Sequence, residues 1–157
     1  MRVYLVTGAA GFIGSHICEE LLKEPSNYVV GIDNFYSGKP ENIELLKSLS
    51  KNFIFYEIDI RDQDPLSAIM EKHTVKYVFH EAAIASVQVS VENPLLTNDV
   101  NIKGSLSVLE AARRNNVSRF LFASSAAVFG DEPTLPKNEK SVTKPISQYG
   151  LEKLVVE

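Results

Sequence analysis

The chain has 157 residues, of which 45% are hydrophobic and 23% are charged, a balance that suits one folded domain and excludes a disordered chain. The formal net charge is −4 with no basic run, which argues against a nucleic-acid partner, and no apolar stretch is long enough to span a membrane. The single cysteine, Cys18, excludes a disulfide framework. We therefore expect a reducing, cytoplasmic setting, with Cys18 as a small buried residue rather than a nucleophile.

Short apolar runs rich in β-branched residues alternate along the chain with longer helical patterns. Strands are predicted at residues 2–6, 28–33, 53–58, 76–82 and 119–124. Helices are predicted at residues 12–24, 40–50, 65–73 and 94–115, and a last helix begins near Ser147 and is still running at Glu157. Strands separated by helices imply parallel pairing, and strands that are apolar on both faces imply a sheet covered on both sides. The pattern predicts a doubly wound parallel sheet, with a ligand site beyond the carboxyl ends of its strands.

The longest predicted helix has a clear beginning in the sequence. Asn93 is a plausible N-cap, and Pro94 suits the first helical position because its missing N–H is not needed there. Ile102, Leu106 and Leu109 recur at helical spacing, so we expect them to form the buried stripe of this helix.

The stretch VTGAAGFIGSH joins the first predicted strand to the first predicted helix. Gly8 permits a tight turn, Gly11 lets the backbone approach a pyrophosphate, and Gly14 lets the helix pack close to the sheet. The free N–H groups and the dipole at the helix start then favour an anion. A plain strand-to-helix turn is the alternative, because three glycines alone are a weak signal. The strand before, the helix after and an acidic residue at the end of the next strand favour a dinucleotide.

That acidic residue is Asp33, 19 residues beyond Gly14. Its carboxylate can accept hydrogen bonds from the adenosine ribose and would repel a 2′-phosphate, so NAD is favoured over NADP; a solvated Asp at a strand end is the alternative. Asp59 and Ile60 follow the third strand and are expected to meet the adenine, with a purely structural role as an equal alternative. The predicted cofactor site also includes Phe12, Ile13, Asn34, Ala82 and Ala83. No metal site is predicted.

Two pairs of polar residues lie at and beyond the end of the fifth predicted strand. Ser124 and Ser125 end that strand, where a hydroxyl can meet a substrate. Tyr149 and Lys153 lie on one face of the last predicted helix, either as an ordinary exposed pair or as an acid/base and its helper. Tyrosine is a poor base at neutral pH because its ordinary pKa is about 10, but a nearby lysine ammonium stabilises a phenolate. Such a tyrosine can remove a proton from a substrate hydroxyl while hydride leaves the same carbon.

Together, the loop TGAAGFIG, the serine before AAVFG and the Tyr149-x-x-x-Lys153 pair resemble the extended short-chain dehydrogenase/reductase family, over the whole chain. Within that family the chain looks most like nucleotide-sugar 4-epimerases of the UDP-glucose 4-epimerase type. DNFYSGKPENI resembles the loop after the ribose-binding Asp, and DVNIKG loosely meets the family pattern NVxG. Family dehydratases carry a threonine and an acidic residue where this chain has Ser125 and Ala126, which speaks against dehydration. GDEPTLPKNEKSVTKPISQYG looks closest to enzymes that act on UDP-N-acetylhexosamines.

The resemblance implies a Rossmann-type NAD-binding domain over residues 1–157 and an NAD-dependent epimerisation at C4 of a UDP-hexose or a UDP-N-acetylhexosamine. Tyr149 would take the proton of the 4-hydroxyl with help from Ser125. Hydride would pass from C4 to NAD, and the resulting 4-keto sugar would take it back on its other face. Lys153 would hold the nicotinamide ribose, and Ser124 would line the nicotinamide side.

Other positions carry weaker implications. Asn101 would support the site or is an ordinary helix residue, and His80 is expected to be a packed strand-end residue rather than an acid/base. Phe129 stands where the family more often has tyrosine, and Ala85 replaces a lysine of some epimerases. Family members are longer, so we expect a sequence truncated before the C-terminal strands and the sugar-nucleotide domain of a homodimeric enzyme. The alternatives are another nucleotide-sugar oxidoreductase or dehydratase of the family, or a non-enzymatic NAD-binding regulator.

Overall fold

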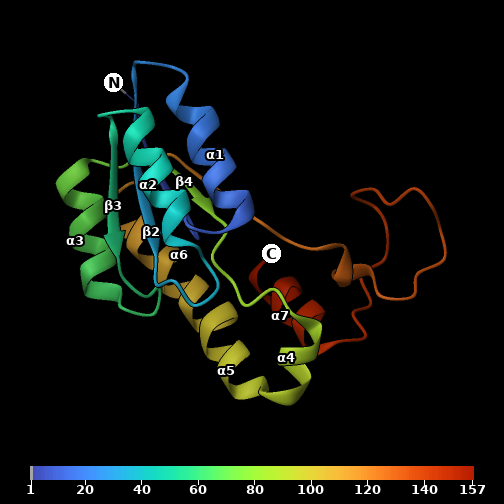
Figure 1. Cartoon of the computed structure of the whole chain (residues 1–157). Coiled ribbons are helices and arrows are strands. Elements are labelled where there is room, and N and C mark those ends of the chain that lie inside the picture. The colour runs from blue at the N-terminus through green and yellow to red at the C-terminus, as the bar shows by residue number, and fades with distance from the viewer. Residues whose placement is uncertain (1) are drawn as a thin grey trace. The chain divides into compact units, whose positions relative to one another are not determined.

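The computed structural model describes residues 2–157, which divide into two compact units (Figure 1). One, called here the sheet unit, comprises the chain up to Ala82 together with Ser107–Ala123. The other, called the helical unit, comprises Ala83–Leu106 and Ser124–Glu157. The parallel strands therefore belong to the first unit, and the helix that carries Tyr149 belongs to the second.

The sheet unit is built on parallel strands. Within residues 2–157 the sheet has five strands in the order β3-β2-β1-β4-β5, and neighbouring strands are parallel throughout. The strands are β1 (Arg2–Thr7), β2 (Asn27–Asp33), β3 (Phe53–Glu57), β4 (Tyr77–His80) and β5 (Arg119–Phe122). The strand order reverses at β1, as in dinucleotide-binding sheets of the Rossmann type. The predicted parallel sheet is confirmed, with every strand end within two residues of the one expected.

Helices cover both faces of this sheet. They are α1 (Phe12–Leu22), α2 (Pro40–Leu49), α3 (Gln63–His73) and the part of α6 (Ser105–Arg114) from Ser107 onward. Successive strand residues point to opposite faces, and the neighbours Leu5 and Val6 are both fully buried, so neither face is open to solvent at this point. The Asn115 amide donates to the Ser67 carbonyl (3.3 Å) and hydroxyl (3.0 Å), which ties the end of α6 to α3. The doubly wound arrangement is therefore also confirmed.

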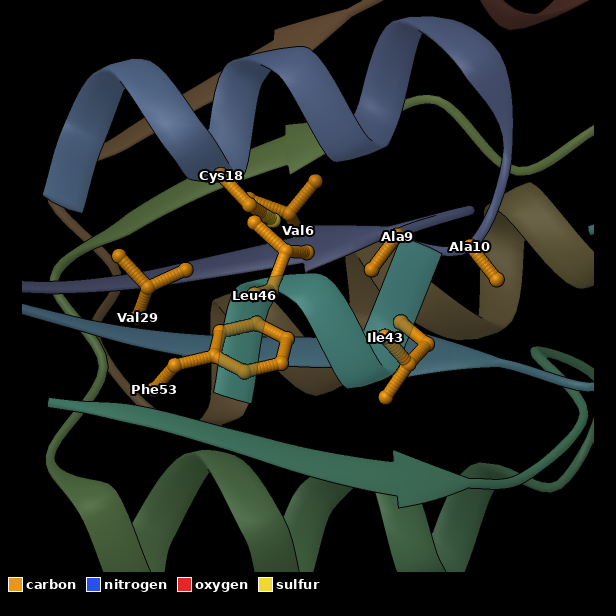
Figure 2. Close-up of a cluster of buried hydrophobic side chains, with 8 residues drawn as sticks. All are labelled: Val6, Ala9, Ala10, Cys18, Val29, Ile43, Leu46 and Phe53. Carbon is orange, nitrogen blue, oxygen red and sulfur yellow. The ribbon is translucent and has the colours of Figure 1, made fainter. Parts of the chain in front are cut away.

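Figure 2 shows the hydrophobic cluster between the sheet and the helices α1 and α2. Its buried members are Val6, Ala9, Ala10, Cys18, Val29, Ile43, Leu46 and Phe53. Cys18 is fully buried, as predicted, and burial raises the pKa of its thiol to about 12. Because Ala9 and Ala10 belong to the glycine loop, the hydrophobic core extends directly beneath that loop.

The helical unit contains short helices, of which those between Val87 and Leu106 follow one another almost without a break. They are α4 (Val87–Glu92), α5 (Pro94–Asn98), the π-helix η1 (Asp99–Gly104), the first residues of α6, the 3-10 helix η2 (Ala126–Phe129) and α7 (Gln148–Val156). The Asn93 side chain accepts a hydrogen bond from the Leu96 amide, with Pro94 in the first helical position, so the predicted cap is confirmed. The α4 helix was not predicted.

The buried stripe predicted for the longest helix is wrong at Leu106, and Ile102 and Leu109 are only half-buried. Leu106 is 63% exposed, and the buried residues of this segment include Asn101, Gly104 and Ser105. The reason is the π-helical turn at Asp99–Gly104, because a π-turn holds an extra residue and rotates the face that follows it. The Ser105 hydroxyl donates to the Asn101 carbonyl (2.6 Å) inside this turn.

Candidate functional site

The glycine loop leaves β1 through a turn that requires glycine. Gly8 has φ = +70°, and a Cβ built on it would lie 2.8 Å from the Ala82 nitrogen. Both the left-handed backbone and the closeness of the chain after β4 exclude a larger residue at this position. The Gly11 amide then donates to the Gly8 carbonyl (3.0 Å), which closes the turn. The tight turn expected at Gly8 is present.

The start of α1 lies directly after this turn. A Cβ on Gly14 would overlap the Gly8 carbonyl oxygen, so glycine is needed for the helix to begin so close to β1. Gly11 is the N-cap residue and has no side chain to occupy the first amides of α1. Phe12 and Ile13 are 80% and 59% exposed beside these amides. The helix start therefore offers N–H groups and a positive dipole end to an anion, flanked by apolar side chains.

Asp33 ends β2 and is buried against the glycine loop, not solvated. Its carboxylate accepts hydrogen bonds from the Ala10 amide (3.0 Å) and the Phe35 amide (2.8 Å). The Ala10 carbonyl in turn accepts from the Lys39 amide (2.9 Å) and the Asn42 side chain (2.8 Å). A carboxylate has about four acceptor positions, so Asp33 keeps capacity for further donors such as ribose hydroxyls.

Asn34, Asp59 and Arg61 form a second polar group at the same end of the sheet unit. The Asn34 amide donates to the Asp59 carboxylate (2.8 Å), and Arg61 donates to both carboxylate oxygens (2.9 and 2.8 Å). The hydrogen bonds from Arg61 lower the pKa of Asp59 to about 2. Sequence reasoning missed Arg61, although an arginine two residues after an acidic strand end was a usable signal. Ile60, between these two residues, is buried.

The end of β4 is held by polar contacts with β1. The Thr7 hydroxyl accepts from the Ala82 amide (3.2 Å) and is hydrogen-bonded to the His80 ring (2.7 Å). His80 is fully buried, and its ring lies near those of Phe120 and Phe122, with centroids 5.8 and 5.9 Å away. The prediction of a packed strand-end histidine is confirmed, and Ala82 is placed against Gly8 by this arrangement.

In the helical unit, Ser125 begins η2. Its hydroxyl accepts from the Ala127 amide (3.2 Å), while the Ser124 hydroxyl is hydrogen-bonded to the Glu157 carboxylate. A Cβ on Gly150 would lie 2.6 Å from the Ala127 carbonyl oxygen. Glycine at position 150 therefore lets α7 pack directly against the turn that Ser125 caps.

Tyr149 and Lys153 occupy one face of α7, as predicted. The helix begins at its N-cap Ser147, whose hydroxyl accepts from the Gly150 amide (3.0 Å). The Tyr149 amide donates to the buried Ser90 hydroxyl of α4 (3.1 Å). The Lys153 Nζ lies 5.9 Å from the centroid of the Tyr149 ring, and Lys153 is only 4% exposed. The buried lysine therefore lies within cation–π range of the Tyr149 ring, on the same face of α7.

Asn101 and Glu152 are joined inside the helical unit. The Asn101 side chain accepts from the Ile84 amide (2.8 Å) and donates to the Ile84 carbonyl (3.2 Å) and to Glu152 (2.7 Å). Asn101 thus fixes the backbone beside Ala83, which is itself half-buried. Sequence reasoning missed Glu152, because a charged helix residue is usually solvated.

The predicted site residues therefore fall into two groups. The sheet unit brings together the glycine loop, Asp33, Asn34, Asp59 and Ala82, and the helical unit carries Ser125, Tyr149, Lys153 and Asn101. The first group is suited to a phosphate and a ribose, and the second to proton transfer.

No helix within residues 2–157 is both long and apolar enough to cross a membrane.

Comparison with known proteins gives the class of protein that these features define. The sequence model of the NAD dependent epimerase/dehydratase family matches residues 4–157, so the chain belongs to this family and the predicted membership is confirmed. A relative from Methanocaldococcus jannaschii, a putative UDP-glucose 4-epimerase, is 41% identical over 155 residues, which are 98% of this chain and 48% of the relative.

Solved structures agree with this placement. A UDP-glucose 4-epimerase from Stenotrophomonas maltophila, with bound NAD and formylated UDP-arabinopyranose, has a TM-score of 0.93 and 36% identity, covering 99% of this chain and 46% of that one. A UDP-N-acetylglucosamine 4-epimerase from Methanobrevibacter ruminantium, in complex with UDP-N-acetylmuramic acid, has a TM-score of 0.90 and 40% identity, covering 99% and 48%. The chain spans about half the length of the relatives it matches.

Proposed function

We propose that the complete gene product is an NAD-dependent UDP-sugar 4-epimerase. The observation that carries this proposal is the Tyr149–Lys153 pair, with a buried ammonium held over the phenol ring, in a member of the NAD dependent epimerase/dehydratase family. The UDP-sugar epimerases of similar structure support the UDP-linked substrate.

The sheet unit fits NAD. Gly8 and Gly14 let the loop pack closely against the chain after β4 and against the start of α1, and that helix start would receive the pyrophosphate beside Phe12 and Ile13. Asp33 would accept from the adenosine ribose hydroxyls and repel a 2′-phosphate. Asn34, Asp59, Ile60 and Ala82 would complete the contacts of this unit with the adenosine and the pyrophosphate, and Ala83, the first residue of the helical unit, is a further proposed contact. When bound, NAD would supply the hydride acceptor and donor.

The helical unit would supply proton transfer. Tyr149 would take the proton from the sugar 4-hydroxyl as a phenolate and return it later as the neutral phenol, with Lys153 beside it on α7. Ser125 would donate its hydroxyl to the sugar oxygen, and Lys153 would also hold the nicotinamide ribose. Ser124 would line the nicotinamide side, and Asn101 would support the site through Ile84. The proposed substrates are a UDP-hexose or a UDP-N-acetylhexosamine.

A homodimer is part of the proposal. Exposed apolar side chains gather on α4, α5 and α7 of the helical unit: Val87, Val91, Leu95, Leu151 and Val155. Helices with such faces commonly pair with another copy. Light scattering of the purified gene product at several concentrations would give the mass of a dimer, and a monomer at all concentrations would contradict it.

The test is an assay of the complete gene product with UDP-galactose and UDP-N-acetylgalactosamine, followed by separation of the sugar nucleotides. Formation of the C4 epimer of either is expected. Tyr149→Phe should lower kcat by at least about 10²-fold, because it removes the proton acceptor, while NAD binding is retained. Protein that carries NAD but forms no epimer of either sugar would refute the proposed function and favour another nucleotide-sugar oxidoreductase or a regulator.

A further inference from the structure

We propose that Glu152 is a positioning residue: its buried carboxylate holds α7 at the rotation that presents Tyr149 and Lys153. This inference rests on the proposed function, because the reaction that Glu152 would serve is the proton transfer by Tyr149.

Glu152 is an unusual residue for a helix. It is fully buried, and its carboxylate accepts hydrogen bonds from the Thr97 hydroxyl (2.7 Å), the Asn101 amide (2.7 Å) and the Gln148 amide (3.2 Å). A buried carboxylate is costly unless donors surround it, and here they come from α5, η1 and its own helix. The carboxylate therefore joins α7 to the segment that begins at Pro94.

The orientation of the Asn101 side chain requires a hydrogen-bond acceptor at position 152. Its oxygen accepts from the Ile84 amide, so its nitrogen must be the atom that faces Glu152. The group opposite must then be an acceptor. A carboxylate or an amide oxygen satisfies this requirement, and an apolar side chain leaves a buried N–H without its partner.

This contact controls the rotation of α7 because of where it lies. Glu152 is three residues after Tyr149 and directly before Lys153, within one helical turn of both. A second tie lies at Tyr149 itself, where the backbone amide donates to Ser90. With Glu152 removed, α7 loses its side-chain hydrogen bonds to α5 and η1 and is freer to rotate, and a misplacement of about 1 Å of a reacting group costs roughly 10²-fold in rate.

The variants follow from the donor set. Glu152→Gln can present its oxygen to Asn101 and its amide to the Thr97 hydroxyl, which can accept in turn. Glu152→Leu has a similar size and no acceptor. The matched control is Glu92, an exposed residue of α4 that accepts from Gln88 (2.8 Å) at the same four-residue spacing as the Gln148–Glu152 pair.

The experiment compares the complete wild-type gene product with Glu152→Gln, Glu152→Leu, Glu92→Gln and Glu92→Leu, measuring kcat, KM and bound NAD for each folded protein. For Glu152→Leu we expect a loss of about 10- to 100-fold in kcat with KM within about threefold, since the reacting group moves and sugar contacts remain. Glu152→Gln should recover most of kcat, and both Glu92 variants should match the wild type.

Several results would overturn the inference. One is a Glu152→Leu variant that has a lower melting temperature but the wild-type kcat per NAD-loaded molecule, which is the behaviour of a merely structural residue. Glu152→Gln as impaired as Glu152→Leu would contradict the acceptor argument. An inactive wild type would instead refute the proposed function. If the wild type is inactive, amide hydrogen exchange still tests the role of Glu152. Peptides that cover Ile84 and α7 should exchange faster in Glu152→Leu only, and equal protection in all variants would overturn the inference.

Discussion

The sharpest test of the glycine loop compares Gly8→Ala with Gly11→Ala. At Gly8 the left-handed backbone costs a non-glycine residue about 1–2 kcal/mol. The new Cβ would also lie 2.8 Å from the Ala82 nitrogen, a backbone atom that cannot swing away. Overpacking of this kind costs about 1–3 kcal/mol. Together the two effects predict a loss of about 2–5 kcal/mol, a large part of a typical stability of about 5–15 kcal/mol.

Gly11→Ala is the matched control. Gly11 has φ = −76°, which any residue adopts, and a Cβ there would meet the Gly8 carbonyl oxygen at 3.2 Å. We expect its stability to stay within about 1 kcal/mol of the wild type, since the slight crowding is offset by the lower entropy of the unfolded chain. Its NAD affinity should nevertheless fall, because the methyl group would occupy the space proposed for the pyrophosphate.

Urea denaturation of the complete gene product without NAD, with titration calorimetry for NAD, measures both quantities. Gly8→Ala should lower the denaturation midpoint. Gly11→Ala should leave the midpoint nearly unchanged and lower the affinity for NAD. Equal midpoints for Gly8→Ala and the wild type would refute the conformational argument. Unchanged NAD affinity in Gly11→Ala would refute the assignment of the pyrophosphate to this loop.

Two further predictions concern titratable groups. Since burial raises the pKa of Cys18 to about 12, the thiol should react with a disulfide reagent at pH 8 only after unfolding; rapid labelling of the native protein would contradict this burial. Arg61 lowers the pKa of Asp59 to about 2, below its ordinary value of about 3.9, so the pair stabilises the fold above about pH 4 and this contribution is lost as the pH falls through 2. Arg61→Gln should raise that pKa and cost up to about 1 kcal/mol at pH 7, with a smaller cost near pH 2 in denaturation midpoints. The same cost at both pH values would show that Arg61 acts without Asp59.

The sheet was predictable because each strand is marked by a short stretch of consecutive residues. The runs around Leu5, Val30 and Val78 are apolar on both faces, and glycine and polar stretches separate them from the helices. The Gly8 turn was predictable for the same reason. The long helix was predicted in extent but not in its buried face, because helical spacing assumes a uniform rotation per residue and the π-turn at Asp99–Gly104 breaks it.

The contacts that organise the candidate site were not visible in the sequence. The sequence suggests that Glu152 is a solvated charge, and the donors Thr97 and Asn101, about 50 residues earlier, are not visible in it. Likewise, Arg61 acquires its role through Asp59 and the loop residue Asn34. Such pairings depend on the tertiary fold, which residue spacing along one chain does not encode.

The backbone of Ala10 makes the conformation of the glycine loop depend on residues outside the glycine motif. Asp33 accepts its N–H, and Lys39 and Asn42 donate to its carbonyl, so the loop takes its shape from residues outside the glycines. An engineer who replaces Asp33 to admit NADP therefore also removes the acceptor that orders the phosphate-binding turn. A cofactor switch in this protein needs a second acceptor for the Ala10 amide, and a transplanted TGAAGFIG segment needs all three supports to keep its conformation.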